Sequence, residues 1–348
     1  MSGDLILVTG YGGFLGASIV RRLLEFGYRV RGLARSDYPE LRRLGVEPVQ
    51  ASLTDVNSVA RAMEGCTGVV HTAARAGVWG AWQEYFDPNV RGTEILLAAA
   101  RRSGVRAFVY TSSPSVTFAA KHQSGIDETT PYPNRWLCHY PHTKALAEQM
   151  VLRAAGSELG TCALRPHLIW GEGDPHLMPR VIQKALAGRL KRVGSGTNLI
   201  DVVHVDRAAL AHVDALRRLL GGASEVSGQA YFLTDGRPQE CWSWIGRILD
   251  GAGVDVPRGA VSYRVAYAIG AVMEGCYRAL RIRREPPMTR FVAAQLALDH
   301  YFSIGKAKRE LGYRPIDDFD AVFDECRPWL KRVAEAIRSG RTLPSGHA

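Results

Sequence analysis

Short apolar segments alternate with longer amphipathic segments through the first half of the chain. Runs such as Leu5–Thr9 and Gly68–Thr72 have the length and composition of buried strands, whereas the segments between them carry apolar residues at helical spacing. We predict strands at residues 5–9, 28–34, 46–49, 68–72, 107–112 and 162–169, and helices from the first glycines to about Phe26 and at residues 56–63, 88–103 and 140–155.

Strands that alternate with helices in this way indicate an α/β fold. The apolar strands belong in a parallel sheet that is covered on both faces, and right-handed crossovers make it doubly wound, as in a Rossmann fold.

The alternation of strand-like and helix-like segments becomes less regular after Trp170. We predict a loop at 171–175, a helix at 179–187, a short strand that runs into a helix within 201–219, and one more strand of the main sheet at 230–234. Further helices are predicted near 242–251 and 265–280, before a break at Pro286 and Pro287. We expect a Rossmann domain of residues 1–170 plus about 200–235, a smaller and mostly helical substrate lobe of 171–199 plus about 236–340, and a tail at 341–348.

Composition narrows the class of protein. The chain has 348 residues, of which 46% are hydrophobic, and no uncharged apolar stretch of membrane-spanning length. Met1 leads almost directly into the first strand, so we expect a cytoplasmic protein. The formal net charge is +10, but the arginines are scattered and no nucleic-acid motif is present, so we expect no nucleic-acid partner. Cysteines and histidines lack metal-ligand spacing, and we expect no metal.

The segment VTGYGGFLG joins the first strand to the first helix. Glycines in such a turn allow a tight bend, a close approach of the backbone to a pyrophosphate and close helix–strand packing, while the helix N-terminus attracts the phosphates. The segment therefore predicts a dinucleotide site. Its predicted contacts are Gly10, Tyr11, Gly12, Gly13, Phe14, Leu15 and Gly16.

The end of the second strand favours NADP over NAD. NAD sites place a carboxylate there to bind the ribose 2′-hydroxyl. This chain has Leu33-Ala34-Arg35-Ser36 instead, and an arginine can pair with a 2′-phosphate. Asp37, slightly further on, is the competing candidate for NAD.

Tyr140 and Lys144 are the strongest candidates for chemistry. They stand four residues apart in CHYPHTKALAE, which places both side chains on one face of a helix. An ammonium beside a phenol lowers the phenol pKa, so Tyr140 is predicted to exchange a proton with an alcohol or ketone oxygen near neutral pH. Ser113 stands 27 residues earlier, after the strand FVYT, where its hydroxyl can bind the same oxygen. His139 and His142, which flank the pair, are either substrate contacts or ordinary surface or core residues.

These residues carry a family pattern. The chain resembles the extended short-chain dehydrogenase/reductases over nearly its whole length. The matching segments are TGYGGFLG, HTAA (residues 71–74), NVRGT (89–93), YTSSPSV (110–116), YPHTK (140–144), LRP (164–166) and VHVD (203–206).

The resemblance implies a role for each matching residue. Ser113, rather than Ser112, would bind the substrate carbonyl, Tyr140 would be the general acid in reduction, and Lys144 would hold the nicotinamide ribose. Asn89 would belong to the helix that supports the Lys144 end of a proton relay. Further implied cofactor contacts are Ser52, Leu53, Thr72, Ala73, Ala74, Thr111, Pro166 and His167. The family usually has an aspartate in a GDL motif near the adenine, whereas this chain has Ser52 there.

Within this family, the chain resembles the 3β-hydroxysteroid dehydrogenase-like branch. Four segments are similar to bacterial reductases of 2-alkyl-3-oxoalkanoates in long-chain olefin biosynthesis: AARAGVWGAW, YTSSPSV, LRPHLIWGEGD and EPPMTRF. The resemblance implies NADPH-dependent reduction of a β-keto acid with two alkyl chains, and a homodimer formed through helices of the first domain. A 3β-hydroxysteroid dehydrogenase, a nucleotide-sugar epimerase or dehydratase, and a non-catalytic NADP-binding protein stay open as alternatives.

Several apolar features suit a large apolar ketone or alcohol as substrate. Val78, Trp79 and Trp82 follow a strand end, where α/β sheets bind ligands, and we expect them, with Pro114 and His167, to contact substrate. The apolar helix Val265–Leu280 precedes several arginines. It is either a lid over an alkyl pocket, an interfacial helix on an anionic membrane, or an ordinary lobe helix. Contact with the membrane periphery or with pathway enzymes stays open in the same way.

Overall fold

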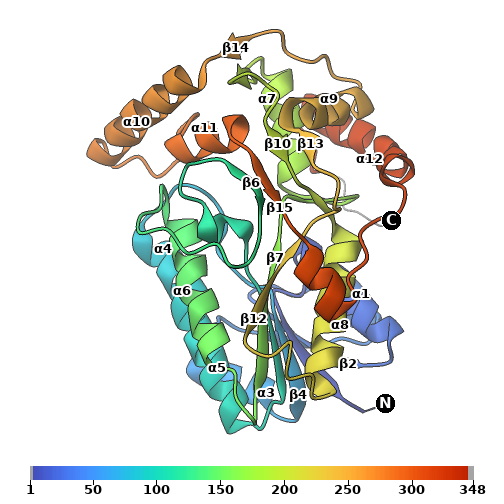
Figure 1. The fold of residues 1–348 in the computed structure, drawn as a ribbon. Helices are drawn as coiled ribbons and strands as arrows, with labels where there is room; N and C mark the ends of the chain where they lie inside the picture. Colours follow the sequence, from blue (N-terminus) through green and yellow to red (C-terminus); the bar gives the residue numbers. More distant parts are fainter. Residues whose placement is uncertain (1–2, 344–348) are drawn as a thin grey trace.

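The computed structural model describes residues 3–343 and is built around a seven-stranded parallel sheet (Figure 1). The strand order is β12-β7-β5-β4-β1-β2-β3, so the chain reverses direction across the sheet between β1 and β4. Ligands bind beside such a switch point, at the carboxyl ends of the strands. The strands are β1 (Leu5–Thr9), β2 (Arg29–Ala34), β3 (Glu47–Gln50), β4 (Cys66–His71), β5 (Ala107–Thr111), β7 (Gly160–Pro166) and β12 (Gln229–Leu233). The predicted Rossmann fold is confirmed.

Helices cover both faces of this sheet. One face is covered by α1 (Phe14–Glu25) and α8 (Val205–Leu220), and the other by α3 (Val56–Met63), α5 (Gly92–Arg102) and α6 (His139–Arg153) (Figure 1). Strand β1 shows why both faces are needed, because successive side chains point to opposite sides. Ile6 and Val8 are buried under α1 and α8, whereas Leu5 and Leu7 are buried under α3 and α5. A short helix, α2 (Pro39–Arg43), follows β2.

Two predicted elements near the site have different bounds. The helix predicted at 88–103 extends back to Trp82, through α4 (Trp82–Phe86) and a π-helical turn η1 (Asp87–Arg91) into α5. The strand predicted at 162–169 ends at Pro166, because Leu168 takes a left-handed conformation (φ 43°) that turns the chain. The chain then continues as β8 (Ile169–Trp170), which pairs with β11 (Val203–His204).

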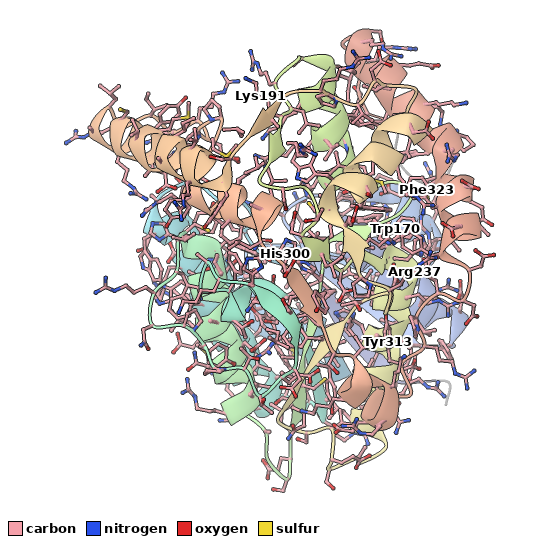
Figure 2. All side chains as sticks on the ribbon, turned by 45° about the horizontal axis from the view of Figure 1, so that its top comes forward. Trp170, Lys191, Arg237, His300, Tyr313 and Phe323 are labelled. Atoms are coloured by element: carbon pink, nitrogen blue, oxygen red, sulfur yellow. The ribbon has the colours of Figure 1, made fainter. Side chains whose placement is uncertain are left out.

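The substrate lobe has its own apolar core above the carboxyl edge of the sheet. Helices α7 (Leu177–Leu186), α9 (Cys241–Gly251) and α12 (Phe319–Arg338) enclose Trp170, Trp244 and Phe323. The rings of Trp170 and Phe323, labelled in Figure 2, lie 5.9 Å apart. Helix α12 has no counterpart among the predicted elements. The remaining lobe helices are α10 (Tyr263–Ala279) and α11 (Arg290–Ala297).

The lobe also contains short strands that the sequence did not predict. A four-stranded sheet has the order β13 (Gln239–Glu240), β10 (Leu199–Ile200), β15 (His300–Phe302) and β6 (Gln123–Ile126), and β9 (Arg192–Val193) pairs with β14 (Ala260–Val261). Strands this short carry too few residues for a periodic signal. Single turns complete the structure: η2 (Pro114–Thr117) and η3 (Ala307–Leu311).

The packing departs from the predicted domain division at two places. Strand β6 lies within the first predicted segment, yet it pairs with β15 of the lobe. Conversely, Ile304, Leu311 and Tyr313 lie in the predicted lobe segment but are buried in the core under α8. The chain therefore crosses between the two units more often than the sequence predicts. Of the predicted tail, the structure describes residues 341–343.

Candidate active site

A cavity of about 1170 Å³ lies along the carboxyl ends of β1, β2, β4 and β5. Its size and position suit a dinucleotide. Most of the predicted cofactor contacts line it: Gly10, Gly13, Phe14, Leu15, Gly16, Arg35, Ser52, Leu53, Thr72, Ala73, Ala74, Thr111, Tyr140, Lys144 and Pro166. The sequence did not identify Arg75, Ala76, Asp174, His176 and Leu177, which line it as well.

The glycine loop forms the floor of this cavity. Gly10 has φ 66°, and a Cβ atom there would come within 2.9 Å of the Ala73 backbone. A Cβ at Gly16 would lie 2.2 Å from the Gly10 carbonyl oxygen. Helix α1 starts at Phe14 with no side-chain cap on Gly13, and no acidic residue lies in its first turn. Its first N–H groups are therefore available to an anion such as a pyrophosphate.

Three predicted cofactor contacts do not line the cavity: Tyr11, Gly12 and His167, of which His167 lines the smaller cavity described below. The Tyr11 side chain is only 1% exposed and packs against Gly32 of β2, because a β2 residue without a side chain leaves room for the ring. Gly12 lies under the ring of Tyr38, which a Cβ atom would approach to 2.1 Å. Tyr38 lines the cavity, whereas Tyr11 and Gly12 do not.

The end of β2 presents a cation rather than a carboxylate to the cavity. Arg35 and Ser36 line it. Asp37, the competing candidate, is absent from the lining and forms an ion pair with Arg42 at 3.4 Å. Ser52 lies in the same wall, with its hydroxyl 2.8 Å from that of Thr54.

Three of the four residues predicted to take part in catalysis, Ser113, Tyr140 and Lys144, meet where this cavity joins a smaller one. Ser113 and Tyr140 line both cavities, and Lys144 lines the larger one. Ser113 follows β5 and caps the turn η2, with its hydroxyl 2.9 Å from that of Ser115. Ser112, the alternative, is buried and reaches only the larger cavity. The structure therefore brings Ser113, from the turn after β5, together with Tyr140 and Lys144 of α6.

The electrostatics of the pair differ from the prediction. We expected Lys144 to lower the pKa of Tyr140, but burial raises the pKa of Tyr140 to about 12, although a hydrogen bond with Ser113 partly offsets this. The Lys144 ammonium instead donates a hydrogen bond of 2.5 Å to the Thr111 carbonyl and lies 4.1 Å from the centre of the Tyr110 ring. Burial lowers the pKa of Lys144 to about 7, so its amine is only partly protonated at neutral pH. Tyr140 is thus held in its protonated form.

Asn89 supports the start of α6 rather than Lys144 directly. It lies in the π-helical turn η1, is buried, and donates hydrogen bonds to the Arg75 carbonyl (3.1 Å) and the Thr143 hydroxyl (3.0 Å). Its side-chain oxygen Oδ1 accepts a hydrogen bond of 2.7 Å from the Arg75 backbone N–H. Thr143 in turn donates to the Tyr140 carbonyl at 3.0 Å. Asn89 therefore fixes the loop after β4 and the turn of α6 that carries Tyr140.

A second cavity of about 210 Å³ opens from Ser113 and Tyr140 toward the lobe. Three of the predicted substrate contacts, Val78, Pro114 and His167, line it. His167 lines this smaller cavity and not the larger one, so its predicted contact with the cofactor stays a prediction. The lobe supplies residues that the sequence did not identify as substrate contacts: Phe291, Gln295, His300 and Phe302. Phe291 is the last residue of the segment EPPMTRF, and the similarity of this segment to the olefin-biosynthesis reductases was the only sequence signal for these four residues.

The two tryptophans predicted to contact substrate lie elsewhere. Trp79 donates a hydrogen bond of 3.1 Å to the Ile282 carbonyl and packs against Tyr277 of α10. Trp82 packs between Phe86 and the rings of His139 and His142. Both tryptophans connect structural elements, and His139 and His142 are packing residues as well.

Helix α10 lines neither cavity, so it is not itself a lid. It packs on α11 so closely that a Cβ atom at Gly270 would lie 2.6 Å from the backbone of Thr289. Its outer face is apolar: Val265, Ile269 and Val272 are 50%, 42% and 66% exposed. Within residues 3–343, no helix has the length and hydropathy needed to cross a bilayer.

The parallel sheet, the glycine loop and the Ser–Tyr–Lys constellation define an oxidoreductase of the short-chain dehydrogenase/reductase class. A sequence profile of the 3-beta hydroxysteroid dehydrogenase/isomerase family matches residues 7–261. The chain belongs to this family.

Three relatives of this chain have names that describe two kinds of enzyme. The chain is 46% identical to a 2-alkyl-3-oxoalkanoate reductase of Shewanella oneidensis, over 88% of this chain and 81% of the relative. It is 44% identical to a protein of the same name from Stenotrophomonas maltophilia, over 89% and 94%. It is also 34% identical to a 3 beta-hydroxysteroid dehydrogenase/Delta 5-->4-isomerase of Mycobacterium tuberculosis, over 96% and 92%.

Solved structures share the fold. A dTDP-glucose 4,6-dehydratase, DesIV, from Streptomyces venezuelae has NAD and DAU bound. It matches with a TM-score of 0.71 and 24% identity, covering 93% of this chain and 96% of that chain. This likeness bears on the fold alone.

Proposed function

We propose that this chain catalyses the NADPH-dependent reduction of a 2-alkyl-3-oxoalkanoate to the corresponding 2-alkyl-3-hydroxyalkanoate, as a step in long-chain hydrocarbon biosynthesis. The observation that carries the proposal is the position of Ser113 and Tyr140, which line both the dinucleotide-sized cavity and the smaller apolar one. The names of the two most similar relatives reported above supply the substrate class.

The residues of this chain supply binding and proton transfer. The nicotinamide cofactor, when bound, supplies the hydride. The Ser113 hydroxyl donates a hydrogen bond to the ketone oxygen of the substrate. Tyr140 gives its proton to the same oxygen as negative charge develops there. A phenol whose pKa is raised by burial stays protonated at neutral pH, and its proton moves readily to an alkoxide, which is the stronger base. This protonation state suits the reduction that we propose.

NADPH is the form of the cofactor that we propose. Arg35 lies on the cavity wall at the end of β2, where a 2′-phosphate would lie, and Asp37 is turned toward Arg42. The resemblance to a family of nicotinamide-dependent enzymes and the glycine floor of the cavity support the dinucleotide itself.

A comparison of substrates and one variant tests the proposal. NADPH oxidation is measured with a long-chain 2-alkyl-3-oxoalkanoate, a 3-ketosteroid and a nucleotide sugar. We expect turnover with the first. Turnover with the steroid alone would instead support the dehydrogenase named in the mycobacterial relative.

We expect Tyr140→Phe to lower kcat by roughly 10²–10⁴-fold, because only the proton donor is lost, and to leave NADPH binding within a few-fold. Tyr301→Phe is the matched control, since Tyr301 lies on β15 outside both cavity linings. Full turnover in Tyr140→Phe would refute the mechanism.

We further propose contact with an anionic membrane surface through α10. Its outer apolar face lies next to Arg281, Arg283 and Arg284, all exposed. Apolar side chains that enter the headgroup region and arginines that pair with anionic lipids are the features of interfacial helices. The homodimer implied by the family resemblance is likewise proposed, and its mass in solution is the test.

A further inference from the structure

The small cavity contains a pair of buried histidines that the reduction chemistry described above does not use. His167 follows β7, His300 begins β15, and both line the cavity with Tyr140. Figure 2 shows His300 near the centre of the molecule. The two side chains are 7% and 2% exposed, and His167 Nε2 lies 2.7 Å from His300 Nδ1. Polar groups are costly to bury, so a pair in this position invites a functional explanation.

The backbone fixes the direction of the hydrogen bonds in this pair. The Gln295 carbonyl oxygen, 2.7 Å from His300 Nε2, can only accept, so this nitrogen carries the hydrogen. In a neutral ring, His300 Nδ1 is then an acceptor, and His167 Nε2 must be the donor. His167 Nδ1 is left with a free lone pair. Within residues 3–343 no hydrogen bond is recorded to this atom.

The cavity around this nitrogen is otherwise apolar. Its wall consists largely of hydrophobic side chains: Val78, Pro114, Phe118, Leu168, Phe291 and Phe302. None of the described residues that line it is a lysine or an arginine. His167 and Leu168, which has a left-handed conformation (φ 43°), both line this cavity. A substrate with a second polar group beside its ketone can therefore place that group only against the histidine pair or against the hydroxyls and amides near Ser115 and Gln123.

We propose that His167, held in position by His300, binds the carboxyl group of the substrate and thereby selects a β-keto acid over a ketone without an acidic neighbour. This assignment rests on the proposed function. In a β-keto acid the carboxyl carbon is separated from the ketone carbon by one atom, so the two groups occupy neighbouring positions. The ketone oxygen lies at Ser113 and Tyr140, and the carboxyl group at His167 Nδ1. A steroid ketone has no group to satisfy this acceptor.

The proposal includes a balanced proton step. Burial and the neighbouring ring lower the pKa of His167 well below its ordinary value, and burial lowers that of His300 to about 4, so both rings are neutral before substrate binds. As a carboxylate enters, one proton from solvent moves to His167 Nδ1, and no covalent bond changes. The other titratable groups near the pair are Tyr140, Asp201 and Asp299, and Asp299 is bonded to His122 and Ser124.

The test compares an acid with its ester. A 2-alkyl-3-oxoalkanoate and its methyl ester are assayed with NADPH and the full-length enzyme. We expect the wild type to prefer the acid by at least about tenfold in kcat/KM, which is a typical effect of a charge-assisted hydrogen bond. His167→Phe keeps the ring shape and is expected to bring the ratio of kcat/KM for the acid to kcat/KM for the ester close to one, mainly through a higher KM for the acid.

A second pair of variants separates positioning from packing. In His300→Gln the amide can donate to the Gln295 carbonyl and accept from His167, so we expect the acid preference to survive. His300→Leu is expected to lose it. A pH indicator in weak buffer should report uptake of about one proton per site when the 2-alkyl-3-hydroxyalkanoate binds the wild type with NADP, and none with His167→Phe.

The outcomes are distinct. Equal loss of activity on acid and ester in His167→Phe would show a packing role and overturn the assignment. Equal turnover of acid and ester by the wild type would also overturn it, while the proposed function would stand. No turnover of either compound would refute the proposed function itself.

Discussion

Replacement of Lys144 by methionine is expected to abolish most activity and yet make the protein without cofactor more stable. Lys144 is 2% exposed, and burial lowers its pKa from 10.5 to about 7. A lysine in water is fully charged at pH 7, so folding must either bury the charge or release the proton. Methionine fills a similar volume without this cost.

The magnitude follows from the pKa shift. A displacement from 10.5 to about 7 corresponds to roughly 4 kcal/mol of folding free energy at pH 7. Methionine leaves the Thr111 carbonyl without its hydrogen bond from Lys144, which costs about 1–3 kcal/mol. We therefore expect Lys144→Met to raise the free energy of unfolding by about 1–3 kcal/mol at pH 7. Activity should fall by at least roughly 10²-fold, because the group beside Tyr140 is lost.

The sign of the pH dependence provides a stricter test. Between pH 7 and about 10 the unfolded wild type binds a proton on Lys144 that the folded protein does not, so the stability of the wild type rises with pH in this range. The advantage of Lys144→Met must shrink accordingly.

Urea unfolding at pH 7, 8 and 9.5 without cofactor measures this, and Lys308→Met, at an exposed position of η3, is the control, with an expected change within about 0.5 kcal/mol. A lower stability of Lys144→Met at pH 7, or an advantage that grows with pH, would show the reasoning to be wrong.

Three further predictions concern other parts of the molecule. Arg35→Ala should raise the KM for NADPH by roughly ten- to a hundred-fold and leave the KM for NADH nearly unchanged, as measured by steady-state kinetics with both cofactors; equal effects on both would remove Arg35 from the 2′-phosphate site. Glu148→Ala should cost about 3–5 kcal/mol in urea unfolding, because Arg165, whose Nη2 lies 2.6 Å from Glu148, would become an unpaired buried charge; a loss below about 1 kcal/mol would contradict this. Val272→Glu should reduce flotation of the protein with anionic phosphatidylserine vesicles, whereas Val256→Glu, a change at another exposed valine outside α10, should not; equal flotation of both variants would argue against a membrane contact at α10.

The main sheet and the cofactor loop could be predicted because their signals are local. A buried parallel strand needs a short apolar run, and the crossovers between such strands have one hand, so the order of elements along the chain implies the sheet. Helix α3 has the predicted bounds, because the spacing of apolar residues along a helix is also a local signal. The glycines at 10 and 16 are required by contacts with Ala73 and with the loop itself, which the sequence pattern already indicates.

The small strands of the lobe and helix α12 were not predicted from the sequence. Strand β15 has three residues and pairs with β6, which lies more than 170 residues earlier in the chain. No local pattern specifies such a partner, since the pairing depends on how the lobe packs over the sheet. Here β6, from the first predicted unit, pairs with β15 of the second, and the predicted domain division itself stays a prediction.

The sequence by itself determined the fold class and the family of the chain. It also predicted the glycine loop as the dinucleotide site and Ser113, Tyr140 and Lys144 as the catalytic group. Each of these depends on residue types at fixed local spacing. Only the tertiary structure decided how these residues behave. Burial, which is a property of the packed molecule, raises the pKa of Tyr140 and lowers that of Lys144. The tyrosine, whose pKa was predicted from helical spacing to be lowered by the lysine, is therefore held protonated instead. The same holds for His167 and His300, which are 133 residues apart and form one pair only because β15 packs beside the end of β7.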